Sequence, residues 1–180
     1  MQEALHLFAQ KGVEAVTVRD IGDRAGYTNA ALFKFFASKD ALALCLFEFC
    51  YAGLFQRLSA TFRPEMPFPD RLHAIVTVFL AELDRDPDAF LFVQDQLRAM
   101  WPRVSRSVRR QSILGLIRTV LEQGVLEGRI APDADLKLLI AAITGTLQQF
   151  ARMLSFGEFR GPAADWSAGL ERILIRIVAA

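Results

Sequence analysis

Two short helical patterns joined through a single glycine shape the N-terminal part of the sequence. Thr17 can cap the first, and Asp20, three residues later, can reach back in an arrangement close to a capping box. Gly26 stands where this helix would end, because glycine adopts the left-handed conformation at little cost. Thr28 can cap the second helix and Ser38 a third. Two helices joined by a tight glycine turn have the form that places a helix in the major groove of DNA.

Four spaced motifs lie in and around this segment. They are Phe-x-x-Lys-Gly from Phe8, Thr-Val-Arg-Asp-Ile from Thr17, Arg-Ala-Gly from Arg24 and Phe-x-Ser-Lys-x-x-Leu from Phe36. With these motifs, residues 1 to about 46 closely resemble, without a gap, the DNA-binding domain of TetR-type transcriptional regulators. The remainder of the chain is similar to that family only in its helical layout.

The resemblance implies a DNA-contacting set on and around the second helix. An amide there can read adenine, small residues allow close approach to thymine methyl groups, and a lysine at a helix start can bind phosphate. A solvent-exposed helix face would carry much the same residue types. The expected DNA-binding residues are Thr17, Thr28, Asn29, Ala30, Phe33, Lys34 and Lys39.

Two features of the sequence lower the affinity for DNA that is expected of residues 1–40. Phe33 and Phe35 stand where the family usually has hydroxyl or imidazole groups that touch phosphates, and phenylalanine can only pack there. Residues 1–40 carry five positive and five negative side chains, so this part is formally neutral. Because neutralisation of phosphates by Lys and Arg supplies most non-specific affinity, we expect weak DNA binding by these 180 residues. We also expect an upstream extension rich in Arg or Lys, and the alternative is that Met1 is the true start and shape complementarity compensates for weak binding.

The composition fits a helical globular protein. Hydrophobic residues make up 53% of the 180 residues, which is ample for a core, and the net charge of +1 does not by itself indicate a nucleic-acid partner. No transmembrane span or signal peptide is predicted, so a cytoplasmic protein is expected. Cys45 and Cys50 are expected to be buried thiols, and with His6 and His73 they form no metal-ligand pattern. No cofactor is expected.

Apolar residues at helical spacing continue to the end of the chain. Proline and glycine interrupt the pattern at 63–69, 128–132 and 157–162, and one long helix is expected over 104–127. The sequence predicts an all-α fold of about nine helices, with an N-terminal three-helix bundle that contains the helix-turn-helix. The expected domains are 1–42 for DNA binding and 43–180 for ligand binding and dimerisation.

Two expected helices at the end of the chain, 135–156 and 165–178, have wide apolar faces, which need a partner surface. Burial within one chain would satisfy them, but the resemblance implies a four-helix interface in a homodimer. The expected interface residues are Leu136, Ile140, Ile143, Leu147, Phe150, Trp166, Leu170, Ile173, Leu174 and Ile177. Ala141, Ala142 and Gly145 form a strip of small residues beside this face.

The resemblance also implies a cavity for a small-molecule effector. Aromatic and apolar residues at helical spacing are more often plain core, and a few polar neighbours could orient a ligand. The expected ligand-binding residues are Phe79, Phe90, Val93, Gln94, Leu97, Met100, Trp101 and Leu121.

A cluster of five arginines follows this stretch, namely Arg98, Arg103, Arg106, Arg109 and Arg110. One interpretation is a solvated face that pairs with the acidic corner at residues 82–88. The other is an anion-binding mouth or a contact for an acidic partner.

The sequence therefore predicts a ligand-responsive, dimeric DNA-binding transcriptional regulator. We expect a repressor that a small, mainly apolar effector releases from a palindromic double-stranded operator. The alternative is a small-molecule binding or sequestering protein with vestigial DNA binding. An enzyme is not expected, because no Ser/His/Asp, Cys/His, paired-carboxylate or metal constellation supports one.

Overall fold

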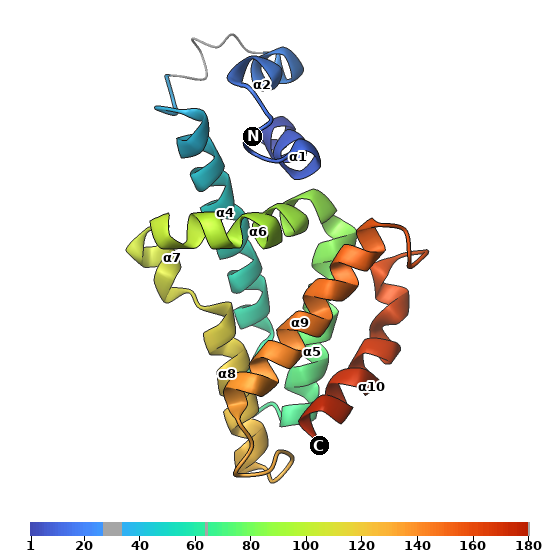
Figure 1. Ribbon diagram of the computed structural model, residues 1–180. Coiled ribbons are helices and arrows are strands. Elements are labelled where there is room, and N and C mark those ends of the chain that lie inside the picture. Colours follow the sequence, from blue (N-terminus) through green and yellow to red (C-terminus); the bar gives the residue numbers. More distant parts are fainter. Residues whose placement is uncertain (27–33, 64, 180) are drawn as a thin grey trace. The chain divides into compact units, whose positions relative to one another are not determined.

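The computed structural model describes residues 1–26, 34–63 and 65–179, and their regular elements are all helices (Figure 1). The all-α prediction is confirmed. The chain forms two compact units. The first unit is Met1–Gly53 with Asp86–Arg110, and the second unit is Leu54–Arg85 with Gln111–Ala180. The boundaries of these units differ from those of the predicted functional domains, 1–42 for DNA binding and 43–180 for ligand binding and dimerisation. The division by function stays a prediction.

The first unit joins segments that are far apart in the sequence. It contains α1 (Gln2–Lys11), α2 (Val18–Ala25), the first part of α4 (Lys39–Thr61), α6 (Pro87–Met100), the 3-10 helix η1 (Trp101–Arg103) and α7 (Arg106–Arg110). Phe8 of α1 and Phe92 of α6 are both 1% exposed, and their stacked rings lie 6.0 Å apart between centroids. Nδ1 of His6 and Oδ2 of Asp88 lie 2.5 Å apart across the same two helices. The core of this unit therefore includes α6.

The first part of α4 is a core element of this unit. Leu42, Leu46 and Phe47 are buried, and the ring of Tyr51 lies 5.1 Å from that of Trp101. Among the described helices, α4 alone is long and apolar enough to cross a membrane, a test that core helices of globular proteins also pass. Cys45 is exposed, contrary to expectation, since it lies on the side of α4 away from these buried residues.

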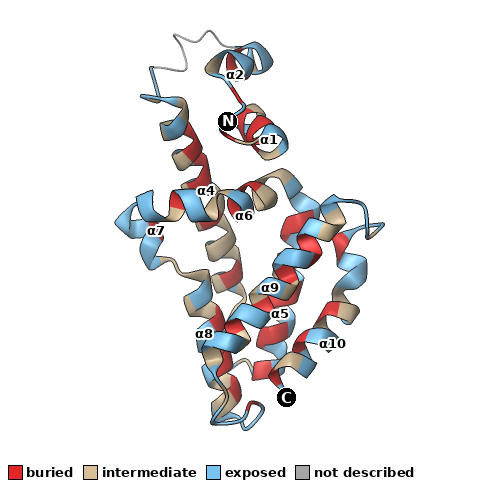
Figure 2. Cartoon of the chain, in the orientation of Figure 1, coloured by how far each residue is buried: buried red, intermediate tan, exposed pale blue. Residues whose placement is uncertain are grey.

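The second unit packs the remaining helices around its own core. It contains the end of α4, α5 (Phe68–Arg85), α8 (Ile113–Leu126), α9 (Leu136–Ser155), the 3-10 helix η2 (Ala163–Trp166) and α10 (Ser167–Val178). The buried carboxylate of Glu82 on α5 accepts hydrogen bonds from Arg57 at 2.6 Å and from Arg85 at 2.5 Å. Two guanidinium groups thus compensate this buried charge, which would otherwise be costly. Buried and exposed positions alternate at helical spacing along α9 and α10 (Figure 2).

The predicted single helix over 104–127 is wrong. α7 ends at Arg110 and α8 begins at Ile113, after Ser112 in an extended conformation with φ −94° and ψ 108°. The Ser112 hydroxyl accepts a hydrogen bond from the N–H of Gly115 at 3.0 Å, so it caps α8. Serine competes with continued helix through such bonds. The spacing of apolar residues does not reveal this break.

Candidate nucleic-acid interface

A reciprocal capping box builds the start of α2. The N–H of Asp20 donates to Oγ1 of Thr17 at 3.1 Å, and Oδ2 of Asp20 accepts from the N–H of Thr17 at 2.8 Å. This confirms the arrangement predicted from the sequence. The side-chain and backbone hydrogen bonds from Thr17 favour the charged carboxylate, so they hold the pKa of Asp20 below its ordinary value of 3.8.

The capping box also limits what the Thr17 side chain can do. Its hydroxyl accepts from the N–H of Asp20 and donates its own proton to Oδ2 of Asp20 at 2.7 Å. No hydroxyl donor is left for a phosphate unless the Asp20 carboxylate gives way. The expected phosphate contact by Thr17 therefore competes with the cap of its own helix.

The turn after α2 leads toward the expected recognition helix. Gly26 ends α2 with φ 70° and ψ 24°, the left-handed conformation predicted from the sequence. Residues 27–33 lie outside the described residues, and they include four expected DNA-binding residues, Thr28, Asn29, Ala30 and Phe33. Lys34 and Phe35 follow and are both exposed, Phe35 to 81%. A large apolar side chain is therefore presented beside the expected DNA-binding surface.

The start of α4 is held by two local interactions. The hydroxyl of Ser38 accepts from the N–H of Ala41 at 3.1 Å, which confirms the predicted cap. Nζ of Lys39 donates to the backbone carbonyl of Glu14 at 3.2 Å, so it ties the start of α4 to the loop before α2. An ammonium group has three donors, and this bond leaves others for a phosphate.

Ion pairs engage several charges of the first unit. The distances are 2.6 Å from Nε of Arg24 to Oε2 of Glu3, 3.6 Å from Nε of Arg19 to Oδ2 of Asp23, and 3.6 Å from Nη1 of Arg103 to Oδ2 of Asp40. The first pair links α2 to α1, and the last links η1 to the first turn of α4. This pairing agrees with the formal neutrality of residues 1–40.

The expected effector-binding residues fall on both units. Phe79 and Leu121 belong to the second unit, where both are buried in the core. The others lie on α6 and η1 in the first unit, where Val93 and Met100 are buried. The effector stripe, as we call Phe90, Gln94, Leu97 and Trp101, is half-buried and follows the helical spacing i, i+4, i+7 and i+11.

The expected dimer residues divide by burial. Six of them are buried within the chain itself, namely Ile140, Ile143, Leu147, Phe150, Leu170 and Leu174. The sequence left two interpretations open for these residues, burial within one chain and burial between two subunits. Burial within one chain holds for these six, because side chains that pack inside their own chain cannot also cover a second subunit. Four others keep at least part of their surface, namely Leu136, Trp166, Ile173 and Ile177.

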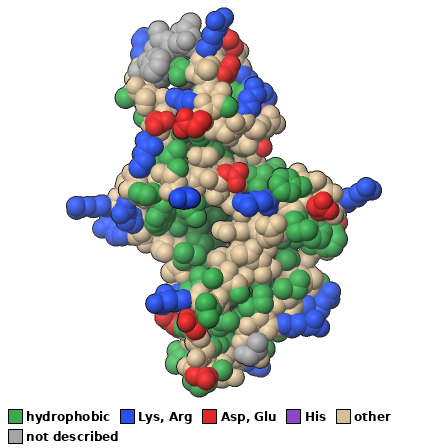
Figure 3. Space-filling model, in the orientation of Figure 1, with side chains coloured by type: hydrophobic (Ala, Val, Ile, Leu, Met, Phe, Trp, Pro, Cys, Tyr) green, Lys and Arg blue, Asp and Glu red, His purple; other side chains and the backbone are tan. Residues whose placement is uncertain are grey.

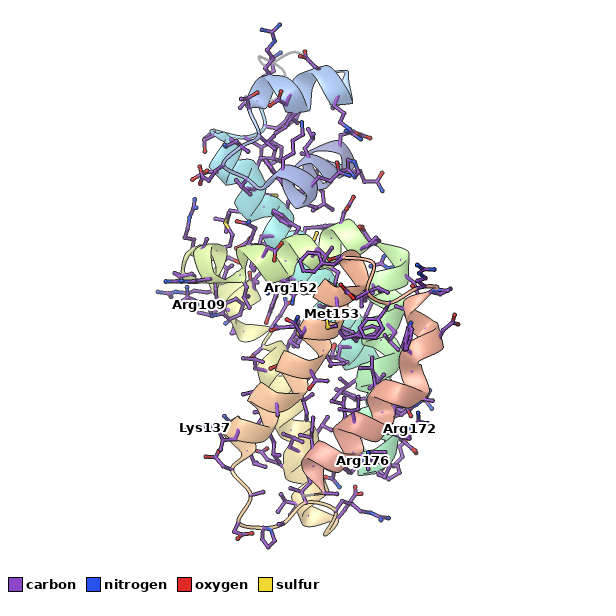
Figure 4. All side chains as sticks on the ribbon, turned by 45° about the vertical axis from the view of Figure 1, so that its right-hand side comes forward. Arg109, Lys137, Arg152, Met153, Arg172 and Arg176 are labelled. Carbon is purple, nitrogen blue, oxygen red and sulfur yellow. The ribbon has the colours of Figure 1, made fainter. Side chains whose placement is uncertain are left out.

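A different side of α9 is exposed and carries the strip of small residues. Ala141, Ala142 and Gly145 are exposed, and an added Cβ on Gly145 would meet nothing within 4 Å. Leu138 extends the strip at helical spacing and is 69% exposed. Figure 4 shows Lys137 and Arg152 toward opposite ends of the same helix. Glycine inside a helix costs about 1 kcal/mol relative to alanine, and no described contact within this chain requires it at position 145.

The chain is similar in sequence and in fold to known bacterial regulators. Residues 1–46 match the family model of bacterial regulatory proteins, tetR family. The chain is 28% identical to the HTH-type transcriptional repressor KstR2 of Mycobacterium tuberculosis, over 97% of this chain and 88% of that protein. Its fold is similar to a bacterial regulatory protein in the tetR family from Rhodococcus RHA1, with a TM-score of 0.83, 21% identity and coverage of 99% and 94%. It is also similar to the transcriptional regulator FadR of Bacillus subtilis in complex with stearoyl-CoA, with a TM-score of 0.77, 16% identity and coverage of 97% and 95%.

The capping box predicts a stability difference with a defined pH dependence. Because the folded pKa of Asp20 is depressed, its charged form contributes stability that is present above the ordinary value of 3.8 and is lost as the pH falls through the depressed value. Asp20→Asn should therefore lower the urea midpoint at pH 7, and the difference from wild type should persist to about pH 5 and vanish in acid. Glu14→Gln, an exposed change in the same unit, is the control. Equal midpoints for wild type and Asp20→Asn at pH 7 would contradict the cap.

Proposed function

Because this chain belongs to the tetR family of bacterial regulatory proteins, we propose that it is a ligand-responsive transcriptional repressor that binds double-stranded DNA as a homodimer in the cytoplasm. The observation that carries the proposal is the pair of capped helices, α2 and α4, on either side of the expected recognition helix. α2 is capped by Thr17 and ended by a left-handed Gly26, and a capped α4 follows. The relatives named above are regulators and not enzymes, and no catalytic role is proposed.

The proposed contact with DNA has two parts. Residues 28–34 enter the major groove, where Asn29 and Ala30 read base edges and Lys34 lies at the border of the contact. Lys39 binds a phosphate at the start of α4 and so sets the position of the groove-reading segment. In a homodimer, two such segments occupy half-sites one helical turn apart, about 34–36 Å, or a multiple of that distance.

The proposed effector is a small, mainly apolar molecule that lies along the effector stripe. Phe90, Leu97 and Trp101 offer apolar surface, and the amide of Gln94 lies among them and can orient a polar group. The structure of FadR contains stearoyl-CoA. A ligand with a long apolar chain would also fit the apolar surface of the effector stripe in this chain. The effector acts only through the difference between its affinities for the DNA-binding and the released conformations.

The proposed dimer uses the exposed side of α9 and not its buried side. Helix axes lie 8–10 Å apart depending on the side chains between them, and small residues permit the closest approach. Ala141, Ala142 and Gly145 meet this requirement, and Leu138 adds apolar area at one end. A second copy of the chain is the proposed occupant because the same strip on each copy is self-complementary about a two-fold axis. This explains a glycine that costs the isolated helix stability.

The dimer prediction is tested at Gly145. Gly145→Arg should leave the helix intact, because open space surrounds the position and arginine is a better helix former than glycine. It should nevertheless give a monomer, since a long charged side chain separates the two copies of α9. Light scattering on the protein as it elutes from a size-exclusion column measures its molecular mass in solution. Ala81→Arg, at an exposed alanine of α5, is the matched control and should remain dimeric. A dimeric Gly145→Arg protein would place the interface elsewhere.

The repressor proposal is tested by selection from a library of random DNA duplexes. The protein should enrich a palindromic sequence whose half-sites are centred about 10–10.5 base pairs apart or a multiple of that distance. Binding to the enriched duplex should weaken steeply with salt, as phosphate contacts require. Enrichment of no sequence above the starting library would reject the repressor. It would favour the alternative, a small-molecule binding protein with vestigial DNA binding.

A further inference from the structure

A dense arginine surface covers the corner where α6, η1 and α7 meet. We use this name for five exposed residues, Arg98, Arg103, Arg106, Arg109 and Arg110. Residues 96–121 contain six arginines and no aspartate or glutamate, and Asp95, three residues before Arg98 on α6, is the nearest acidic residue along the chain. Figure 3 shows Lys and Arg side chains gathered at the left-hand edge, where Figure 1 labels α7, and Figure 4 labels Arg109 at this corner.

The acidic corner at residues 82–88 does not neutralise these arginines. Each of its carboxylates has another partner: Glu82 binds Arg57 and Arg85, Asp84 accepts from the N–H groups of Ala163 and Ala164, Asp86 caps α6 at Ala89, and Asp88 contacts His6. The pairing that would make the arginine surface an ordinary solvated face is therefore not formed. The positive charge needs another explanation.

The backbone beneath the arginine surface is well supported. Glu48 of α4 accepts a hydrogen bond from the N–H of Ser105, and Val104 and Val108 are buried on the inner side. Nη2 of Arg109 donates to the carbonyl of Pro102 at 2.9 Å. The arginine surface is thus built on ordered chain and is not a loose basic tail.

Three of the five guanidinium groups have no partner in the described part of the chain. They belong to Arg98, Arg106 and Arg110, whereas Arg103 contacts Asp40 and Arg109 contacts Pro102. Guanidinium groups present a planar fork of donors that matches phosphate, and this surface uses arginine without any lysine. Like charges on one surface repel one another, and a bound anion relieves this repulsion. The surface therefore fits a polyanion with phosphates spaced along it.

The charge of the first unit points to DNA as that polyanion. Residues 1–40 carry five positive and five negative side chains, whereas residues 86–110 carry five arginines and three aspartates. Residues 41–53 add one negative charge, Glu48, so the first unit has a net charge of +1. The only positive balance in this unit therefore comes from the segment of α6, η1 and α7, and not from the helix-turn-helix. A regulator that binds DNA needs this charge, because phosphate neutralisation supplies most non-specific affinity.

The arginine surface is also continuous with the candidate interface. Nη1 of Arg103 lies 3.6 Å from Oδ2 of Asp40, in the first turn of α4. Asp40 directly follows Lys39, the proposed phosphate ligand. Arg103 thus offsets the one acidic side chain of that turn and connects the arginine surface to the start of α4.

We propose that the arginine surface is a second phosphate-binding surface, which contacts the backbone of duplex DNA flanking the site held by the helix-turn-helix. The inference rests on the proposed function, since it needs a DNA-binding regulator. Contacts to phosphate carry no sequence information. The surface adds affinity, salt dependence and a preference for longer duplexes, and it leaves the recognised sequence unchanged.

The test removes the two partnerless arginines of α7. Arg106→Gln combined with Arg110→Gln is titrated into a labelled 30-base-pair duplex of random sequence at several salt concentrations between 50 and 200 mM, and binding is followed by fluorescence anisotropy. Each lost phosphate contact should reduce the slope of log K against log salt by about 0.9, so the pair should reduce it by roughly 2. Affinity at 100 mM salt should fall on the order of tenfold. The loss of affinity should be smaller on a short duplex, which lacks the flanking phosphates.

The matched control removes the same charge from the second unit. Arg129→Gln combined with Arg160→Gln changes two exposed arginines and should keep the wild-type slope. Equal slopes and affinities for both double variants, with unchanged thermal unfolding, would overturn the second surface. That result would leave the repressor proposal standing and is the one expected if the arginines serve an acidic protein segment instead. A wild-type chain that binds no duplex even at 50 mM salt would overturn both proposals.

Discussion

The stacked contact between Phe8 and Phe92 is the interaction on which the first unit depends. It joins α1, near the N-terminus, to α6, from the middle of the chain, and both rings are almost fully buried. Burial of a phenylalanine is worth about 1.5–3 kcal/mol, and an aromatic pair adds about 0.5–1.5 kcal/mol. A bundle of some forty residues is marginal without such support. The DNA-binding bundle is therefore completed by a helix that lies far away in the sequence.

This arrangement gives α6 three distinct sides. Phe92 packs against α1, the effector stripe is half-buried, and Arg98 is exposed on the arginine surface. An effector that binds along the stripe would therefore act on the helix that supports the DNA-binding bundle. η1 begins at Trp101, directly after the last residue of α6, so a shift of α6 would also move the arginines of η1 and α7. Ligand response and DNA contact can thus be coupled within one compact unit.

The features that the sequence predicted correctly are local. The box between Thr17 and Asp20, the left-handed Gly26 and the Ser38 cap each depend on residues no more than four apart, so the residue types alone indicate them. The features that it missed are long-range or depend on surroundings. Helical periodicity shows that α9 has an apolar face, but not that Ile143 and Leu147 are covered by their own chain. It cannot show that α6 packs on α1, since no local pattern records which distant helix completes a core.

The most direct test of the account is whether α1 and α6 open together. Hydrogen exchange of the α1 and α6 amides is compared between wild type and Phe92→Leu, with Phe156→Leu, a change at a 73% exposed phenylalanine, as the control. A core shared by the two helices predicts that Phe92→Leu lowers amide protection in both by the same factor, roughly tenfold for a loss of about 1.4 kcal/mol. The control should leave both unchanged. If α6 loses protection while α1 keeps it, the DNA-binding bundle does not depend on α6 and the account is contradicted.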